Sequence, residues 1–370
     1  MNKKRVRLSI VVPCYDEEDS LGTCIEKVLE IEDEETALEI IIVDDGSSDN
    51  SLSVARGISE RHPNINVVSH ERNKGKGAAL RTGFQLATGD FVAVQDADLE
   101  YDPADLKRLL EPLRSGKADV VFGSRFLSYG AHRVLYFWHA LGNKFLTFLS
   151  NIFTDLNLTD METCCKVFRR DVIQSISLRE NRFGFEPEII AKIAQKRLRI
   201  YEMGISYYGR TYSEGKKIGP KDGLRALYCI LRYNAHKAPL PVQFLLYFLI
   251  GSVSAVFNLM LFLVLFHGGL DITMATPAAF LAAAGLNYVL CVLLLFRHTA
   301  QWNSVTEVMI YLMLIAVIGW VDLSVTRWLV SAGTAPVLAK GIASMLMFVL
   351  NFLGRRFFVF SEPVSGPWQT

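Results

Sequence analysis

The first 237 residues alternate between short apolar runs and amphipathic stretches. Apolar runs that end at polar turns predict buried strands over 8–12, 39–43, 66–69, 91–94 and 119–122. Between them, the spacing of apolar positions predicts helices over 20–31 and about 75–87. Strands that alternate with helices predict an α/β domain with a parallel sheet and helices on both of its faces.

Four long apolar runs follow in the rest of the chain, at 242–266, 272–296, 308–330 and 337–353. A helix needs about 20 apolar residues to cross the hydrocarbon layer, so each run predicts a transmembrane span. The last 133 positions hold only 9 of the 77 Asp, Glu, Lys and Arg residues. We therefore predict a charged domain over 1–237 and an all-α, four-helix transmembrane domain over 238–370.

The membrane part contains an internal repeat. The string Leu-Asn-Tyr at 286–288 recurs 64 residues later as Leu-Asn-Phe at 350–352, and Asn258 falls against Asp322 at the same offset. Two repeated helical hairpins explain this pattern. Polar groups are costly in lipid, so those of the spans should face the bundle interior, for helix–helix hydrogen bonds or for a lipid pathway. These residues are Asn258, Asn287, Asp322 and Asn351.

Charges in the loops predict the orientation of the spans. Arg297 follows the second run and Arg355 and Arg356 follow the fourth, whereas the loop 267–276 has no Lys or Arg. Positive loops stay inside, so both termini and the first domain are expected in the cytoplasm. The net charge of +1 gives no sign of a nucleic-acid partner. The six cysteines have neither metal nor disulfide spacing, which favours reduced thiols.

Two amphipathic segments lie at about 139–158 and 222–238. In the first, Leu141, Phe145 and Phe148 fall on one helical face, with Asn143 and Thr147 opposite. Such a helix either lies in the membrane interface or packs against the core of its own domain. The interfacial reading would bring a site in the first domain to the depth of lipid headgroups.

Polar loops follow three of the predicted strands: 13–17, 44–49 and Asp96-Ala97-Asp98. In a parallel sheet, ligands bind at the carboxyl ends of the strands, where these loops meet. Asp96 and Asp98 can both reach one hard cation, Mg²⁺ or Mn²⁺, which prefers oxygen ligands. A cation there would neutralise the phosphates of an activated substrate.

The strings at 12–17, 43–49, 72–77 and 96–98 resemble family 2 glycosyltransferases of the Rossmann-like GT-A fold, and among them the dolichyl- and polyprenyl-phosphate hexose synthases. The resemblance implies that the nucleotide sugar contacts Pro13, Tyr15, Glu17, Asp44, Asp45, Lys74, Lys76 and Asp96. It also implies a metal on Asp96 and Asp98, to which Glu100 adds a third ligand. The alternative role for Asp44 is to cap a turn. The alternative for Lys74, Lys76 and Glu100 is that each is a solvated surface side chain.

Three later segments complete the resemblance. Arg125, in Gly-Ser-Arg, lies against phosphate in the family, and the string 159–169 is similar to the segment that forms the acceptor site. Either Glu186 or Glu188 corresponds to an acid near the reaction centre, with helix capping as the alternative. The basic loop that grips the lipid phosphate corresponds to Arg210, Lys216 and Lys217.

The string 351–360 resembles the end of GtrA-like membrane domains. The implied function is an inverting, metal-dependent transfer of a hexose from GDP-mannose or UDP-glucose to a dolichyl or undecaprenyl phosphate at the cytoplasmic membrane face. The motifs are compatible with either donor, either metal and any lipid length. Two alternatives remain: a lipid-linked sugar flippase with a nucleotide-binding domain, and a processive polysaccharide synthase, whose Gln-x-x-Arg-Trp string is absent.

Overall fold

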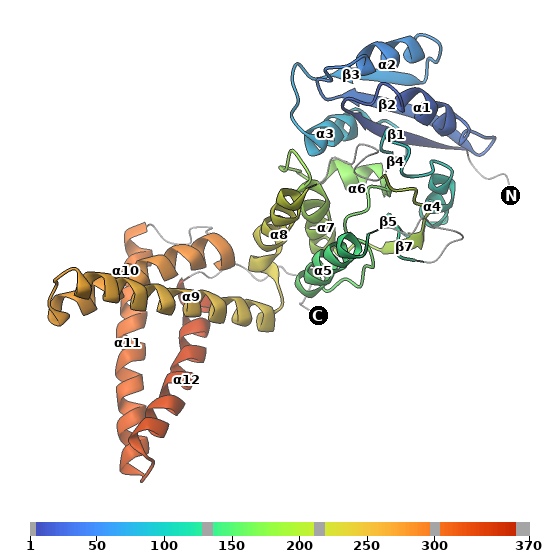
Figure 1. The fold of residues 1–370 in the computed structure, drawn as a ribbon. Coiled ribbons are helices and arrows are strands. Elements are labelled where there is room, and N and C mark those ends of the chain that lie inside the picture. The colour runs from blue at the N-terminus through green and yellow to red at the C-terminus, as the bar shows by residue number, and fades with distance from the viewer. Residues whose placement is uncertain (1–4, 128–135, 211–218, 297–303, 360–370) are drawn as a thin grey trace. The chain divides into compact units, whose positions relative to one another are not determined.

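The computed structural model describes residues 5–127, 136–210, 219–296 and 304–359 (Figure 1). The chain divides into two compact units, residues 1–234 and 235–370. The predicted domain boundary at 237 falls three residues after this division. Each unit is described by itself below.

The first unit is built on a seven-stranded sheet with the strand order β3-β2-β1-β4-β6-β5-β7. Its strands are β1 (Val6–Cys14), β2 (Thr36–Asp44), β3 (Ile65–Ser69), β4 (Phe91–Val94), β5 (Val120–Ser124), β6 (Lys166–Arg169) and β7 (Ile200–Gly204). The α/β fold class is therefore confirmed, and the five predicted strands correspond to β1 through β5.

The prediction of a purely parallel sheet is wrong at β6, which pairs antiparallel with both β4 and β5. Lys166, the first residue of β6, lies opposite Val94, the last residue of β4. The chain therefore enters β6 at the carboxyl ends of its neighbours and has to run back along them. Sequence periodicity gives no strand direction, so this reversal was not predictable from the pattern.

Helices cover both faces of the sheet (Figure 1). On one face, α1 (Leu21–Leu29), α2 (Ser51–Ser59) and α4 (Asp105–Arg114) share a buried core with alternate residues of β1 and β2. On the other face, α3 (Lys76–Leu86) lies against β1, and Phe84 contacts Phe168 of β6 and Phe185 of α7 (Phe185–Gln195). Short α6 (Arg170–Gln174) follows β6 directly and also contacts α3.

Helix α5 (Phe137–Thr154) has its amphipathic faces reversed relative to a core helix. Its polar residues Thr147 and Ser150 are buried, whereas a row of large apolar side chains is exposed. The exposed row consists of Phe137, Trp138, Leu141, Phe145, Phe148 and Ile152. Helix α8 (Pro220–Asn234) packs on α5 and α7 and also exposes Leu224 and Tyr228. The alternative prediction for the 139–158 segment, that the apolar face of α5 packs against the core of its own domain, therefore does not hold.

The second unit begins with a single turn, η2 (Ala235–Lys237), and continues with two helical hairpins. The first is α9 (Leu240–His267), α10 (Ile272–Leu290) and η3 (Cys291–Phe296); the second is α11 (Ser304–Ser331), α12 (Pro336–Gly354) and η4 (Arg355–Val359). Both ends of α11 and α12 fall 64 residues after the corresponding ends of α9 and α10. The boundaries of the helices therefore follow the repeat of the sequence.

Three segments of this unit are long and apolar enough to cross a membrane: Leu240–His267, Pro277–Leu295 and Met309–Ser331. Their positions match the first three predicted spans. The fourth predicted span coincides with α12, and its crossing of the membrane stays a prediction. The first unit contributes none of these segments within the described residues.

Candidate functional site

The loops after β1 and β2 are tied together at the carboxyl rim of the sheet. The Asp16 carboxylate accepts hydrogen bonds from the backbone N–H of Ser48 at 2.7 Å and from its hydroxyl at 3.1 Å. The backbone N–H of Glu17 donates to the Ser51 hydroxyl at 2.8 Å. Arg210, far along the chain, brings its Nη1 to 3.6 Å from Glu17 Oε2. The predicted convergence of polar loops on one rim is therefore present.

Asp96 follows β4 and faces Lys76, the first residue of α3. Lys76 Nζ lies 2.8 Å from Asp96 Oδ1 and 3.9 Å from Glu186 Oε1. Burial by itself raises the pKa of Asp96, but the Lys76 charge outweighs it and the pKa is lowered. Burial likewise opposes the charge of Lys76, and Asp96 holds its pKa well above the ordinary value. The Lys76 ammonium group therefore occupies the position beside Asp96 where a metal ion or a phosphate would bind.

Asp98 is paired with Arg210, whose Nη2 lies 2.7 Å from Asp98 Oδ2. Burial, together with the charges of Asp96 and Glu100, raises the pKa of Asp98 to about 7 despite the guanidinium. The Asp96 charge raises the proton affinity of Asp98, so a cation bound between them would stabilise the ionised pair. The oxygen donors of Asp96 and Asp98 thus fit Mg²⁺ or Mn²⁺.

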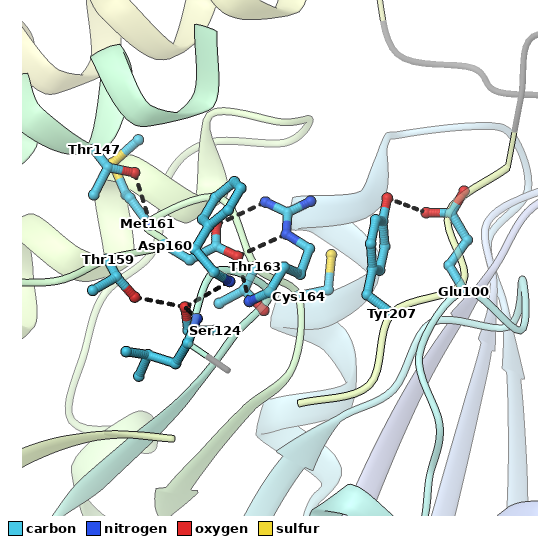
Figure 2. Close-up of polar contacts among 12 residues, drawn as sticks. Glu100, Ser124, Thr147, Thr159, Asp160, Met161, Thr163, Cys164 and Tyr207 are labelled. Atoms are coloured by element: carbon cyan, nitrogen blue, oxygen red, sulfur yellow. Dashed lines mark hydrogen bonds and ion pairs between the residues drawn. The ribbon is translucent and has the colours of Figure 1, made fainter. Parts of the chain in front are cut away.

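Glu100 has a different set of contacts from the third metal ligand expected of it. Its Oε1 accepts the backbone N–H of Arg210 at 2.9 Å. Its Oε2 accepts the Tyr207 hydroxyl at 3.0 Å, as Figure 2 shows. Within the described ranges, no three acidic, His or Cys side chains gather as a metal cluster. Mg²⁺ commonly takes one or two carboxylates and completes its shell with substrate phosphates and water. Asp96 and Asp98 would be enough for such an arrangement, whereas Glu100 holds Arg210.

Arg125 follows β5 and forms a two-pronged ion pair with Asp160. Its Nε and Nη2 each donate to an Asp160 oxygen at 2.7 Å, and its backbone N–H donates to Oδ2 at 3.0 Å. The neighbouring Ser124 and Thr159 hydroxyls bond at 2.6 Å and clamp the same two segments (Figure 2). The guanidinium also stacks on the Tyr207 ring, 5.2 Å from its centroid. The two-pronged face of the guanidinium that was expected to hold phosphate is therefore occupied by Asp160.

The structure separates the two candidate acids on α7. Glu186 is buried near Lys76, its Oε2 has no partner among the described residues, and burial raises its pKa. Glu188 accepts hydrogen bonds from the backbone N–H groups of Arg179 and Glu180 and pairs with Lys192 at 2.5 Å. Glu186 thus lies beside the Asp96 pair, whereas Glu188 holds a turn.

The two acids at the end of β2 also differ. Asp45 accepts His70 Nδ1 at 2.6 Å and the backbone N–H of Gly75 at 2.6 Å. Gly75 has a φ of 98°, and an added Cβ would lie 2.4 Å from the Asn181 carbonyl, so this turn requires glycine. Asp45 therefore fixes the loop that carries Lys76, whereas buried Asp44 keeps one oxygen without a partner in the described part of the chain.

The remaining predicted residues lie at or beyond this rim. Pro13 is the penultimate residue of β1, Tyr15 is exposed just after the strand, and the Lys74 side chain is exposed ahead of α3. Lys216 and Lys217 lie outside the described residues. His70 and Tyr207 were missed because neither belongs to a motif, and Asp160 was quoted only within its segment. Their partners are distant in sequence, so composition and spacing gave no signal.

A cavity of about 340 Å³ lies away from these side chains, at the amino ends of the strands. Phe91 begins β4, Ala118 precedes β5, and Arg199 precedes β7, and all three line it. It is therefore a separate feature from the rim formed by Asp96, Asp98 and Arg210.

The fold and the rim together define a class: an α/β domain of the GT-A type, followed by a helical membrane domain. Residues 9–177 match the glycosyl transferase family 2 model, and residues 246–360 match the GtrA/DPMS transmembrane domain model. The chain therefore combines a family 2 glycosyltransferase domain with a GtrA/DPMS transmembrane domain. The resemblance found in its motifs is confirmed.

Several named proteins are similar to the first unit. A low-salt glycan biosynthesis hexosyltransferase, Agl6, of Haloferax volcanii is 32% identical over 55% of this chain and 48% of its own length. The dolichol-phosphate mannosyltransferase of Pyrococcus furiosus is 26% identical over 62% of this chain and 65% of its own length. The dodecaprenyl-phosphate galacturonate synthase of Rhizobium johnstonii is 29% identical over 57% of this chain and 62% of its own length. The chain thus spans between about half and two thirds of the length of these relatives.

A solved structure supports the fold. Glucosyl-3-phosphoglycerate synthase of Mycobacterium tuberculosis, in complex with uridine-diphosphate, aligns with a TM-score of 0.50 at 18% identity. The alignment covers 62% of this chain and 80% of that protein. At this identity the likeness concerns the fold alone.

Proposed function

We propose that this protein transfers a hexose from a nucleotide diphosphate sugar, GDP-mannose or UDP-glucose, to a polyprenyl phosphate at the cytoplasmic membrane face. The observation that carries the proposal is the meeting of Asp96 and Asp98 with the cations Lys76 and Arg210 at one rim. Such a rim can bind a diphosphate leaving group through a cation and an anionic acceptor through guanidinium groups.

The acceptor needs little activation in this scheme. A phosphate monoester has its second pKa near 6, so it is mostly a dianion at neutral pH and a ready nucleophile. The remaining task is to hold two anions together and align them, which Lys76, Arg210 and Arg125 are suited to do. Mg²⁺ or Mn²⁺ on Asp96 and Asp98 would supply neutralisation of the diphosphate. Attack opposite the leaving group inverts the anomeric carbon.

The exposed apolar face of α5 supports a substrate that is a lipid. Large aromatic side chains on a helix surface are typical of segments that lie in the membrane interface. Phe145 and Phe148 are 53% and 60% exposed, and Trp138 is 78% exposed, so burying them in lipid is favourable. We infer that α5 and α8 bring the rim to headgroup depth.

The decisive experiment uses the full-length protein in proteoliposomes with undecaprenyl phosphate. Labelled GDP-mannose and UDP-glucose are supplied separately, each with Mg²⁺, with Mn²⁺ or with EDTA. We expect one donor to label the lipid only when metal is present. Absence of label from both donors would overturn the proposal and favour the flippase alternative, and long polymer products would favour the processive synthase.

Two further readouts test the finer parts of the proposal. NMR of the product gives the anomeric configuration, and retention would refute aligned inversion. Asp98→Ala is expected to lower the rate at least 100-fold. Asp171→Ala, an exposed carboxylate paired with Arg169 away from the rim, should leave the rate unchanged. Full activity of Asp98→Ala would rule out the metal assignment.

A further inference from the structure

A buried arginine in the second unit lies at the centre of a polar cluster. Arg355 donates to Asn351 Oδ1 at 3.1 Å, to Asn287 Oδ1 at 2.5 Å and to the Tyr311 hydroxyl at 3.3 Å. Its guanidinium stacks on Tyr311 and on Tyr247, 4.8 Å and 5.5 Å from the ring centroids. We call these five residues the Arg355 cluster. Only 5% of the Arg355 surface is exposed.

The cluster is assembled from repeat-related positions. Tyr247 and Tyr311 are 64 residues apart, and so are Asn287 and Asn351. The repeat mate of Arg355 is Cys291, whose sulfur lies 3.8 Å from Arg355 Nη1. A residue that touches its own repeat mate lies on the axis that relates the two hairpins. The two halves thus contribute the same aromatic and amide groups, but only one half contributes a charge.

The charge of Arg355 is not balanced by an acid among the described side chains. All its hydrogen-bond partners are neutral amides, a phenol and a thiol. Asp322 lies eleven residues along α11 from Tyr311, a rise of about 16 Å, and Asp271 lies beyond the far end of α9. The side chain of Glu307 is outside the described part of the chain. An ionised group inside a membrane domain is costly and generally marks a functional site.

The depth of the cluster is that of lipid phosphates. Helix α9 has 28 residues, so it is about 42 Å long and spans the bilayer including its headgroup layers. Tyr247 is seven residues from Leu240, about 10 Å from the end at which the chain enters the unit. Tyr311 has the same place on α11, and Arg355 directly follows α12 at that end. For spans centred in the bilayer, this position places the guanidinium near the boundary between headgroups and hydrocarbon.

We propose that the Arg355 cluster binds the phosphate group of a membrane lipid. Arginine forks onto phosphate oxygens, and basic pockets between membrane helices bind lipid headgroups. Four contacts use four of its five N–H donors, which leaves one for a ligand. The Tyr247 hydroxyl makes no hydrogen bond to the described residues and can donate a second bond. An isoprenoid phosphate and a bulk anionic phospholipid share this chemistry. The site is additional to the rim and does not rest on sugar transfer.

The test counts lipids bound to the full-length protein by native mass spectrometry. The probes are undecaprenyl phosphate, phosphatidylglycerol, undecaprenol and inorganic phosphate. We expect Arg355→Gln to lose one bound phosphate lipid per chain, or to bind it at least 10-fold more weakly. Arg327→Gln, which removes an exposed charge near the other end of α11, should bind as the unaltered protein does. Equal binding by Arg355→Gln and the unaltered protein would overturn the proposal.

The other arms identify the source and guard against misfolding. A preference for undecaprenyl phosphate or for phosphatidylglycerol names the lipid, and binding of undecaprenol equal to that of its phosphate would overturn a phosphate site. Tyr247→Phe removes only a hydroxyl and should weaken binding severalfold while the melting temperature stays unchanged.

Loss of all bound lipid in Arg125→Gln would place the only site at the rim and refute the second one. Failed sugar transfer with intact Arg355-dependent binding would refute the proposed function alone.

Discussion

At the scale of single residues, Asp96 and Asp98 of the rim are each matched by a cation from a distant segment. Lys76 faces Asp96 across 20 residues of sequence, and Arg210 faces Asp98 across 112. Ion pairs of this kind keep the loops in register and neutralise the acids when no metal or phosphate is present. A divalent cation that binds both aspartates would free Lys76 and Arg210 for phosphate oxygens.

The pair Arg125–Asp160 predicts that charge alone is insufficient at residue 125. Arg125→Lys keeps the cation but loses the two parallel bonds, so we expect transfer to fall about 10- to 100-fold. Arg199→Lys, at a two-pronged pair with Asp119 near the amino ends of the strands, is the matched control and should keep its activity. Initial rates at saturating donor measure the effect, and an unchanged rate in Arg125→Lys would contradict a role for the fork.

Glu162 gives a pH-dependence at the same scale. Burial, followed by the nearby Glu186 charge, raises the pKa of Glu162 from 4.5 to about 8. The folded state therefore keeps a proton that the unfolded chain has released at neutral pH. The contribution of Glu162 to the free energy of unfolding is therefore fully present below pH 4.5 and is lost as the pH rises through about 8.

Between pH 7 and 9 we expect this loss to reach about 1 kcal/mol. Glu162→Gln mimics the protonated form and should flatten this part of the profile, whereas exposed Glu111→Gln should not. Denaturant unfolding of the detergent-solubilised protein at several pH values provides the measurement. Parallel profiles for Glu162→Gln and the unaltered protein would show that another group titrates.

At the scale of elements, close contact between α3 and β1 depends on Gly83. A Cβ there would lie 2.2 Å from Val11 Cγ1, deep in the sheet. We expect Gly83→Ala to lower stability by about 1–3 kcal/mol through overpacking. Gly57→Ala, in α2 with open space around it, should raise stability by about 0.5–1 kcal/mol. Melting temperatures that move in the same direction would contradict this account.

Helix α5 makes a prediction about its surroundings. If its exposed face lies in lipid, Trp138 is quenched by brominated phospholipids in proteoliposomes. The Trp138 signal is obtained by subtracting the emission of Trp138→Phe from that of the unaltered protein. Soluble iodide should quench the same signal weakly. Strong iodide quenching without bromolipid quenching would place α5 in water.

The elements also show which part of the fold was readable from sequence. Strands β1 through β5 each contain an apolar run that ends in a polar turn, and all were predicted. Strands β6 and β7 were not, because β6 has only two apolar residues between Lys166 and Arg169, and Glu202 interrupts the apolar pattern of β7. Both charged side chains serve loops: Lys166 donates to the Thr163 carbonyl, and Glu202 accepts the backbone N–H of Thr159 at 2.9 Å. At these two strands, hydrogen bonds to neighbouring loops determine the residue type, so the residue does not follow the apolar pattern of a strand.

At the scale of the whole molecule, motifs predicted which residues meet but not how they pair. The loops holding Asp16, Asp45 and Asp98 do meet at one rim. The pairings of Arg125 with Asp160 and of Glu100 with Tyr207 depend on the path of the chain through β6 and the loop after β7. No local pattern contains that path.

The orientation of the whole chain is a separate prediction. Leu270, in the turn between α9 and α10, is expected outside the cell, and Lys117 of the first unit inside. Leu270→Cys should react with a membrane-impermeant maleimide in intact cells, and Lys117→Cys only after permeabilisation. Five native cysteines are buried and Cys164 is half-buried, so background labelling should be low. The opposite pattern would reverse the topology.

The matched boundaries of the two hairpins have a consequence for their origin. If one hairpin had first assembled as a homodimer, an arginine at the position of residue 355 would have met its own copy across the axis, and the two like charges would repel. Fusing the copies into one polypeptide lets the two positions differ. Cysteine at 291 beside arginine at 355 is a pairing that an identical dimer can never have.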